Sequence, residues 1–253
     1  MEQNIMNVIQ EAQMILVGIG REFSPVCPKE QEKSELWPYL QSRFYEQLPA
    51  DHAVIRAYDA LRRLIGAKPY FAVTMNTDDL IYRSKLEPDL IVAPCGSLQK
   101  MQCTEHIVDA RPIRDAVLAQ AERTEDAAAE SADGTKQDIF AGAVCPICGE
   151  PVRFHTVETE GYLERGYLPQ WEKYTKWLQA TLNHRLCILE LGVDFTYPQV
   201  VRWPFEKVAT YNQKATLIRV SEHFWQLPEH LAGRGISVAQ NPVDYLTGAE
   251  TNF

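Results

Sequence analysis

The stretch Tyr70-Phe-Ala-Val-Thr-Met-Asn-Thr-Asp-Asp-Leu80 decides the fold class. Its apolar start, residues 70–73, follows a proline and predicts a short buried strand. Three polar side chains come next, at Thr74, Asn76 and Asp78. In an open α/β sheet, ligands bind beyond the carboxyl ends of the strands, and an amide beside a carboxylate suits a ribose or an amide-bearing ring. The alternative is a strand-to-helix cap, which Asn and Asp often form.

The rest of the chain alternates predicted helices with short apolar strands. The expected helices cover residues 2–12, 50–66 and 168–180, and the expected strands cover 14–17, 90–93, 186–191 and 215–220. The first strand leads into the turn Gly18-Ile19-Gly20. This alternation predicts an α/β fold with a Rossmann-like parallel sheet and helices on both of its faces.

Composition argues against several classes of protein. A net charge of −9 supplies no basic surface, so we expect no nucleic-acid partner. No apolar run approaches the roughly 20 residues that cross a bilayer, so we expect no membrane association. Residues 1–4 lack the character of a signal peptide. Three of the six cysteines are isolated, at Cys27, Cys95 and Cys187, which is unlike a secreted disulfide framework. We therefore expect a cytoplasmic protein.

Residues 120–138 differ from the rest of the chain. They hold six acidic residues, five alanines and no large aliphatic or aromatic side chain. Such a segment buries too little apolar surface to order itself, so we expect a mobile surface insertion. A solvated helix with an alanine-rich start is the competing interpretation.

Two short cysteine and histidine motifs flank this segment. Cys145-Pro-Ile-Cys148 is typical of half of a zinc site, since two thiolates two residues apart can bind one ion from a tight turn. Cys103-Thr-Glu-His106 offers a second half-site. Together they predict a tetrahedral Cys3His zinc site. The alternative is that His106 is an ordinary surface residue and that the site is lost or three-coordinate.

These motifs, in this order, resemble the sirtuin family of NAD-dependent protein deacylases and ADP-ribosyltransferases. The resemblance runs from about residue 12 to residue 246 and implies one sirtuin-like domain over residues 1–253. Its Rossmann core is expected at about 1–22, 50–98 and 165–250, with a helical cofactor-loop segment at about 23–50. A small zinc module is expected at about 99–164, with the insertion 120–138 inside it.

The resemblance also implies a cofactor site. Thr74, Asn76, Asp78 and Leu80 match the family's Thr-Gln-Asn-Ile-Asp-Gly-Leu segment, in which the Asn and Asp line the pocket for the nicotinamide end of NAD. The glycine turn is similar to the one that holds the pyrophosphate, and other segments resemble those that contact ribose, phosphate and adenosine. The implied cofactor-binding residues are Gly18, Gly20, Thr74, Asn76, Asp78, Gly192, Val193, Asp194 and Ser221.

The implied catalytic positions are Cys95, Asn76 and Asp78, and Cys95 departs from the family. It stands in place of the histidine that acts as general base, whereas a thiol has an ordinary pKa near ~8.5 and is a soft nucleophile. Cys95 could serve as an oxidation sensor, as a covalent acceptor or as a small buried residue.

Further departures affect the cofactor and the acyl-lysine groove. Met75 replaces an amide that orients the cofactor, and Arg21-Glu22 adds charge beside the glycine turn. No Phe-Arg-Gly segment follows that turn, and the family's Phe-Gly-Glu element is not recognisable in residues 154–161. Asp194 would stand beside a phosphate of the same charge.

We therefore expect a divergent sirtuin-like protein that binds NAD or ADP-ribose, together with zinc, but has a degenerate catalytic site. If the protein is an enzyme, it is an NAD-dependent transferase that passes an ADP-ribosyl group to a protein or peptide, to water or to a small acceptor. The alternative is a non-catalytic nucleotide-sensing or protein-interaction module that keeps the fold and the zinc. Deacylation with Cys95 as the base is the third possibility.

Overall fold

The core of the protein is a six-stranded sheet in which all neighbouring strands are parallel, in the order β3-β2-β1-β7-β8-β9. The computed structural model describes residues 2–28, 34–130 and 139–249. The strands are β1 (Met14–Ile19), β2 (Tyr70–Thr74), β3 (Ile91–Val92), β7 (Leu186–Leu191), β8 (Thr216–Ser221) and β9 (Gly235–Ala239). The direction of strand succession reverses between β1 and β7, which places the topological switch point between these strands.

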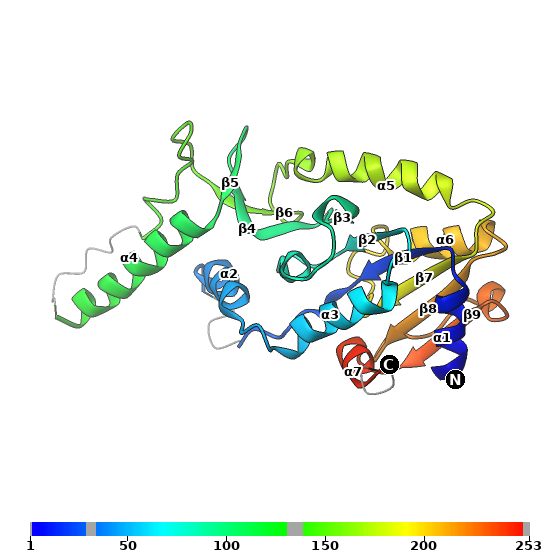
Figure 1. Ribbon diagram of the computed structural model, residues 1–253. Helices are drawn as coiled ribbons and strands as arrows, with labels where there is room; N and C mark the ends of the chain where they lie inside the picture. The colour runs from blue at the N-terminus through cyan, green and yellow to red at the C-terminus, as the bar shows by residue number, and fades with distance from the viewer. Residues whose placement is uncertain (1, 29–33, 131–138, 250–253) are drawn as a thin grey trace.

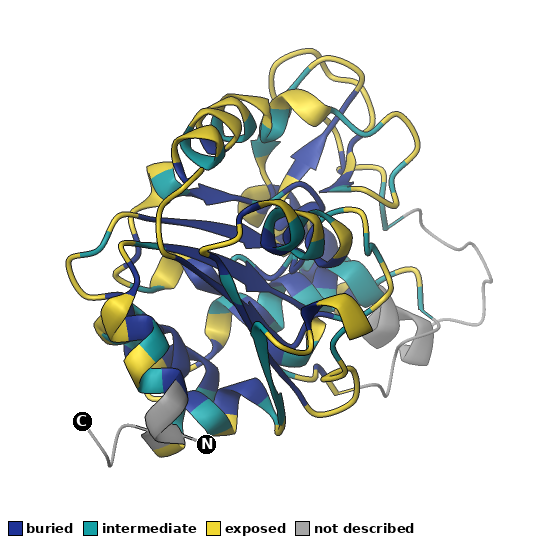
Figure 2. Cartoon of the chain, turned by 90° about the vertical axis from the view of Figure 1, so that its right-hand side faces the viewer, coloured by how far each residue is buried: buried dark blue, intermediate teal, exposed yellow. Residues whose placement is uncertain are grey.

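Helices cover both faces of this sheet, as the sequence predicts (Figure 1). The helices α1 (Glu2–Glu11), α3 (Ala53–Ile65) and α7 (Pro242–Ala249) cover one face, and α5 (Leu168–Ala180) and α6 (Arg202–Tyr211) cover the other. Alternate residues along β1 point to opposite faces, so Ile15 and Val17 pack toward α1 and α3, whereas Leu16 packs toward α6. Burying each such side chain contributes about 1.5–3 kcal/mol. Figure 2 shows the strands buried and the outer helix faces exposed.

A second, antiparallel sheet lies beside the core, in the order β5-β4-β6. Its strands are β4 (Gly96–Gln102), β5 (Ile107–Asp109) and β6 (Arg153–Thr156). The helices α2 (Trp37–Gln47) and α4 (Arg111–Glu130) lie beside this sheet. The buried guanidinium of Arg114 joins these two helices through an ion pair with Glu46. Short 3-10 turns complete the described chain: η1 (Arg21–Phe23), η3 (Leu80–Arg83), η4 (Pro88–Leu90), η5 (Glu164–Gly166) and η6 (Glu229–Leu231).

The first part of the expected insertion, residues 120–130, is helical in the structure. Residues 120–130 continue α4, which extends away from the core sheet (Figure 1). Val117, Leu118 and Ala121 are buried and anchor the helix, and its alanine-rich continuation adds one hydrogen bond for each residue fixed. This agrees with the competing interpretation, a solvated helix, for residues 120–130. Residues 131–138 lie outside the described part of the chain.

The predicted fold class is confirmed: a parallel sheet covered on both faces, with a small second module. Within the described residues, no helix combines the length and the apolar character that crossing a membrane requires.

Candidate functional site

A cleft of about 710 Å³ separates the ends of the core strands from the small sheet. Arg21 and Ser24 reach it from the chain after β1, Met75 and Asn76 from the chain after β2, and Tyr197 from the chain after β7. β6 and its following loop supply the opposite wall, including Arg153, Phe154, Thr156, Val157, Glu158 and Thr159. Its volume is within the usual range for small-molecule sites.

Asn76 brings an unsatisfied carboxamide to the wall of this cleft. The residue is 6% exposed, and neither its Nδ2 nor its Oδ1 has a partner at hydrogen-bonding distance among the described residues. The buried Tyr58 hydroxyl, which is also unpaired, lies close to it: burial raises the pKa of Tyr58, and Asn76 opposes the shift. Its backbone N–H donates to Thr74 Oγ1 at 3.0 Å, which fixes the turn after β2. A buried amide without partners costs about 1–3 kcal/mol, so a ligand that pairs with it regains this energy.

Asp78 is also buried, but its carboxylate is already engaged. It accepts hydrogen bonds from Ser24 Oγ at 2.6 Å and from the backbone N–H of Leu80 at 2.9 Å. Burial raises the pKa of Asp78, and these two hydrogen bonds oppose the shift. Asp78 lines an adjacent cleft of about 680 Å³, next to Tyr45 and Gln99. Asn76 and Asp78 thus belong to one turn but face two neighbouring clefts.

Cys95 lies beneath the cleft rather than in its wall. It is 1% exposed and belongs to an apolar cluster with Phe71, Val73 and Met75. Burial raises the pKa of the Cys95 thiol to about 12, with Asp194 and Glu158 adding to the effect. The thiol is therefore neutral at physiological pH, and its environment is that of a small packing residue.

The glycines near the first turn pack closely against other residues of the protein and leave no space beside them. A Cβ at Gly18 would lie 2.4 Å from Val201 Cγ1, so this glycine allows the start of α6 to approach β1. A Cβ at Gly20 would lie 2.3 Å from the Gly192 carbonyl oxygen. Gly20 and Gly192 thus let the ends of β1 and β7 meet closely, which gives each glycine a packing role.

The remaining implied cofactor residues also have partners within the chain. Val193 is 1% exposed, and its carbonyl accepts a hydrogen bond from Arg202 Nη1. The Asp194 carboxylate accepts from the backbone N–H and the hydroxyl of Thr196, at 3.0 and 2.8 Å. Ser221 is fully buried at the end of β8, where its hydroxyl donates to Glu22.

Glu22 is the residue whose role the sequence analysis did not find. Its carboxylate accepts hydrogen bonds from the Ser221 hydroxyl at 2.9 Å and from the backbone N–H groups of Glu222 and His223 at 2.8 and 3.1 Å. The His223 Nδ1 lies 3.1 Å from the same carboxylate. The charge that Arg21-Glu22 adds beside the glycine turn is visible in the sequence, but the contacts of Glu22 with the end of β8 are not.

The four predicted metal ligands converge in the small module. The ligand atoms of Cys103, His106, Cys145 and Cys148 all lie within 4.8 Å of one another. The Cys103 and Cys148 sulfurs are 3.6 Å apart, and His106 Nδ1 is 3.5 Å from the Cys103 sulfur. Two sulfurs on a zinc tetrahedron lie about 3.8 Å apart at Zn–S bonds of about 2.3 Å. This group therefore has the donors and spacing that could coordinate zinc.

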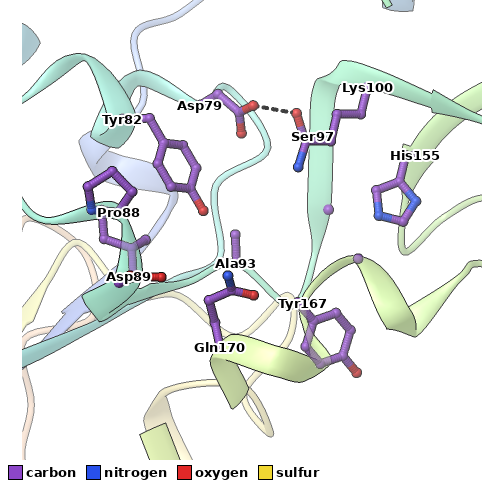
Figure 3. Close-up of a pocket in the computed structure, with 13 residues that line it drawn as sticks. Asp79, Tyr82, Pro88, Asp89, Ala93, Ser97, Lys100, His155, Tyr167 and Gln170 are labelled. Carbon is purple, nitrogen blue, oxygen red and sulfur yellow. Dashed lines mark hydrogen bonds between the residues drawn. The ribbon is translucent and has the colours of Figure 1, made fainter. Parts of the chain in front are cut away.

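A smaller cavity of about 180 Å³ lies between η3, β4 and α5 (Figure 3). Ser97 Oγ donates to the Asp79 carboxylate at 2.5 Å on one side of this cavity, and His155 lies on the other. Gln102 Oε1 accepts from the Leu163 N–H and also contacts His155 Nδ1, so Nδ1 carries the proton. Burial lowers the pKa of His155 to about 4, so its imidazole is neutral.

Comparisons with known proteins agree with this architecture. No protein-family model matches the chain. A protein of Staphylococcus aureus (strain Mu50 / ATCC 700699) named "Protein ADP-ribosyltransferase" is 23% identical over 223 residues, which cover 86% of this chain and 67% of that protein.

Solved sirtuin structures superpose over almost the whole chain. Sir2Tm bound to a propionylated peptide has a TM-score of 0.59 and 11% identity, covering 99% of this chain and 97% of its own. A sirtuin structure concerned with substrate affinity gives 0.61 and 12%, covering 100% and 99%. Sir2Af2 bound to a myristoylated histone peptide gives 0.51 and 14%, covering 100% of both chains. The resemblance in the sequence is therefore confirmed in three dimensions, and the chain has the sirtuin fold.

Proposed function

We propose that this sirtuin-like protein binds NAD or a related ADP-ribosyl nucleotide in the cleft of about 710 Å³. The observation that carries the proposal is the Asn76 carboxamide, which is buried in the cleft wall with both of its polar atoms unpaired. A carboxamide is complementary to the amide of nicotinamide, since each offers one acceptor and two donors. The sirtuin fold and the similarity to a protein named as an ADP-ribosyltransferase support the same ligand class.

In this proposal, Asn76 binds the nicotinamide end of the ligand. Asp78 follows on the same turn and accepts a hydrogen bond from Ser24, which lines the cleft. NAD supplies the glycosidic bond to nicotinamide, and ADP-ribosyl transfer breaks this bond. If the protein turns NAD over, the reaction is transfer of an ADP-ribosyl group rather than lysine deacylation. The reason is Cys95: a buried thiol with a pKa of about 12 cannot accept a ribose proton at neutral pH.

Isothermal titration calorimetry with NAD and with ADP-ribose tests the proposal. Asn76→Ala should lower the affinity for NAD by about tenfold or more, the loss expected for a buried hydrogen-bonding group. It should lower the affinity for ADP-ribose much less. ADP-ribose lacks the nicotinamide that Asn76 would contact. Gln179→Ala, on the exposed side of α5, is the matched control and should leave both affinities unchanged. Equal losses for the two ligands would place Asn76 away from the nicotinamide.

A non-catalytic nucleotide sensor or protein-interaction module is the second candidate. The contacts at the carboxyl ends of β1, β7 and β8 favour this candidate. Gly20 and Gly192 pack closely against neighbouring residues, and Glu22 is hydrogen-bonded to Ser221, so the protein itself fills this space. A measurement of nicotinamide release from NAD separates the candidates. An enzyme releases nicotinamide with turnover, and a sensor binds NAD without consuming it.

We also propose that Cys103, His106, Cys145 and Cys148 hold one zinc ion. The ion would be structural, since all four ligands come from the chain and no open position is left for a substrate. It would fix the turn at Cys145–Gly149 against the small sheet. The β6 wall of the cleft would bind a protein or peptide partner, since two similar sirtuin structures hold a propionylated peptide and a myristoylated histone peptide.

A further inference from the structure

The Glu22 carboxylate is held by four hydrogen-bonding contacts at the end of β8. One oxygen accepts from Ser221 Oγ at 2.9 Å and from the His223 backbone N–H at 3.1 Å, and it also contacts His223 Nδ1 at 3.1 Å. The other accepts from the Glu222 backbone N–H at 2.8 Å. Because a carboxylate only accepts, His223 Nδ1 is a donor here. Successive backbone N–H groups joined by a hydroxyl and a ring N–H make an anion-binding concavity.

The surrounding residues are shaped to admit this side chain. The Glu22 side chain is only 13% exposed. A Cβ at Gly192 would lie 2.6 Å from Glu22 Cβ, and Gly192 has a φ of +65°, so any other residue would be strained and would push Glu22 out. The carboxylate therefore occupies a built position rather than resting on the surface.

This position coincides with the switch point of the sheet. Glu22 follows β1, Gly192 follows β7 and Ser221 ends β8, and these three strands are neighbours. In open α/β sheets, dinucleotides bind across the strand ends at this point, with their phosphates on backbone N–H groups. Here the protein's own carboxylate occupies donors of the kind that bind phosphates in such sheets.

We infer that the donors of Ser221, Glu222 and His223 form an anion site whose resident ligand is Glu22, and that Glu22 thereby determines ligand specificity. A ligand with a phosphate at this position must displace Glu22, whereas a ligand without one leaves it in place. This inference deepens the proposed function, since it rests on nucleotide binding in the neighbouring cleft. It predicts that the wild-type protein discriminates against the diphosphate part of its ligand.

The test compares ADP-ribose with nicotinamide riboside, which carries no phosphate, by calorimetry. Glu22→Ala should raise the affinity for ADP-ribose by about tenfold or more, because charge-assisted hydrogen bonds no longer have to be broken. The affinity for nicotinamide riboside should stay within about twofold, since that ligand breaks none of them.

Glu22→Gln keeps the side-chain shape but directs an NH₂ donor at other donors, so it should give a smaller gain for ADP-ribose. Adding Ser221→Ala to Glu22→Ala should reverse part of the gain. Melting temperatures establish that each variant is folded.

Glu222→Gln is the matched control, because it removes the same charge beside the site and leaves the Glu22 carboxylate seated. An equal gain in Glu222→Gln would show an effect of net charge and would overturn the inference. Equal ADP-ribose affinities in wild type and Glu22→Ala would overturn it while leaving nucleotide binding intact. If no variant binds either ligand, the proposed function fails and the inference fails with it.

Discussion

Glu190 and Arg219 form an ion pair inside the protein, with 2.5 Å between Glu190 Oε2 and Arg219 Nε. Their side chains are 0% and 1% exposed, and Glu206 on α6 adds a second carboxylate 2.7 Å from Arg219 Nη2. Arg219 Nη1 also donates to the Gln226 carbonyl. Arg219 therefore connects β7, β8, α6 and the loop after β8, two residues before Ser221, the hydrogen-bond partner of Glu22.

Glu190→Ala should destabilise the protein by about 1.5–3 kcal/mol, because it removes a buried charge-assisted hydrogen bond while Glu206 still pairs with Arg219. Urea unfolding measures the change. The control is Asp89→Ala, which breaks the exposed ion pair with Lys173 and should cost less than about 1 kcal/mol. Similar small losses in both variants would contradict a structural role for the buried pair.

The zinc site gives a second prediction. Purified protein should carry close to one equivalent of zinc, and Cys145→Ser should release it. Because metal binding stabilises the folded ligand set, hydrogen exchange should then speed up around residues 103–109 and 145–150 more than in the core strands. Cys27→Ser, a substitution of a buried cysteine far from the four ligands in sequence, should retain the metal. A well-folded preparation, never exposed to chelator, that contains no zinc would refute the prediction.

Asp79 gives a prediction about pH. Burial raises the pKa of Asp79 to about 6, although the Ser97 hydrogen bond and Lys100 oppose the shift. In the unfolded chain the pKa is about 3.9, so the folded state binds the proton more tightly. The contribution of Asp79 to stability therefore falls as pH rises from about 4 to about 6 and is constant above that range.

Asp79→Asn should remove this loss, so the variant should gain stability relative to wild type above about pH 6. Asparagine keeps an acceptor for Ser97 and tolerates the φ of 59° at this position. Melting temperatures between pH 4 and 8 measure the difference, with Asp89→Asn as the exposed control. Parallel pH profiles for wild type and Asp79→Asn would contradict the prediction.

Local patterns in the sequence predicted the core of the fold. The apolar run before Thr74 became β2, and the helix predicted over 168–180 has those bounds in the structure. Each metal half-site could be recognised because the spacing of its two ligands is set by the geometry of one turn. These features depend on neighbours in the sequence, so periodicity and spacing reveal them.

Features that depend on distant contacts could not be predicted in this way. The partners of Glu22 lie about 200 residues further along the chain, and nothing near Glu22 indicates them. The family resemblance implied access for a pyrophosphate at Gly18, but its actual neighbours are Val201 and Phe205 of the α6 region. The helix over 120–130 was only the competing interpretation because its anchoring residues, including Val117 and Leu118, precede the biased segment.

Cys95 gives the prediction that separates an enzyme of the usual sirtuin type from a divergent one. At pH 7, a thiol with a pKa of about 12 is ionised on the order of 10⁻⁵ of the time, so it cannot serve as the proton acceptor. Wild-type protein should therefore release no acetyl group from acetyl-lysine peptides in the presence of NAD. Cys95→His should not restore this activity, since the larger ring must enter an apolar cluster beside Met75 and Phe71.

Cys95→Ala supplies the control, because it removes the thiol without filling the site, and NAD affinity should change little since Cys95 does not line the cleft. Deacetylation is followed by mass spectrometry of the peptide and NAD binding by calorimetry. NAD-dependent loss of acetyl groups in wild type that disappears in Cys95→Ala would overturn the prediction. That result would require the thiol to reach the cleft and to ionise near neutral pH, and therefore a rearrangement of the cluster that now encloses Cys95.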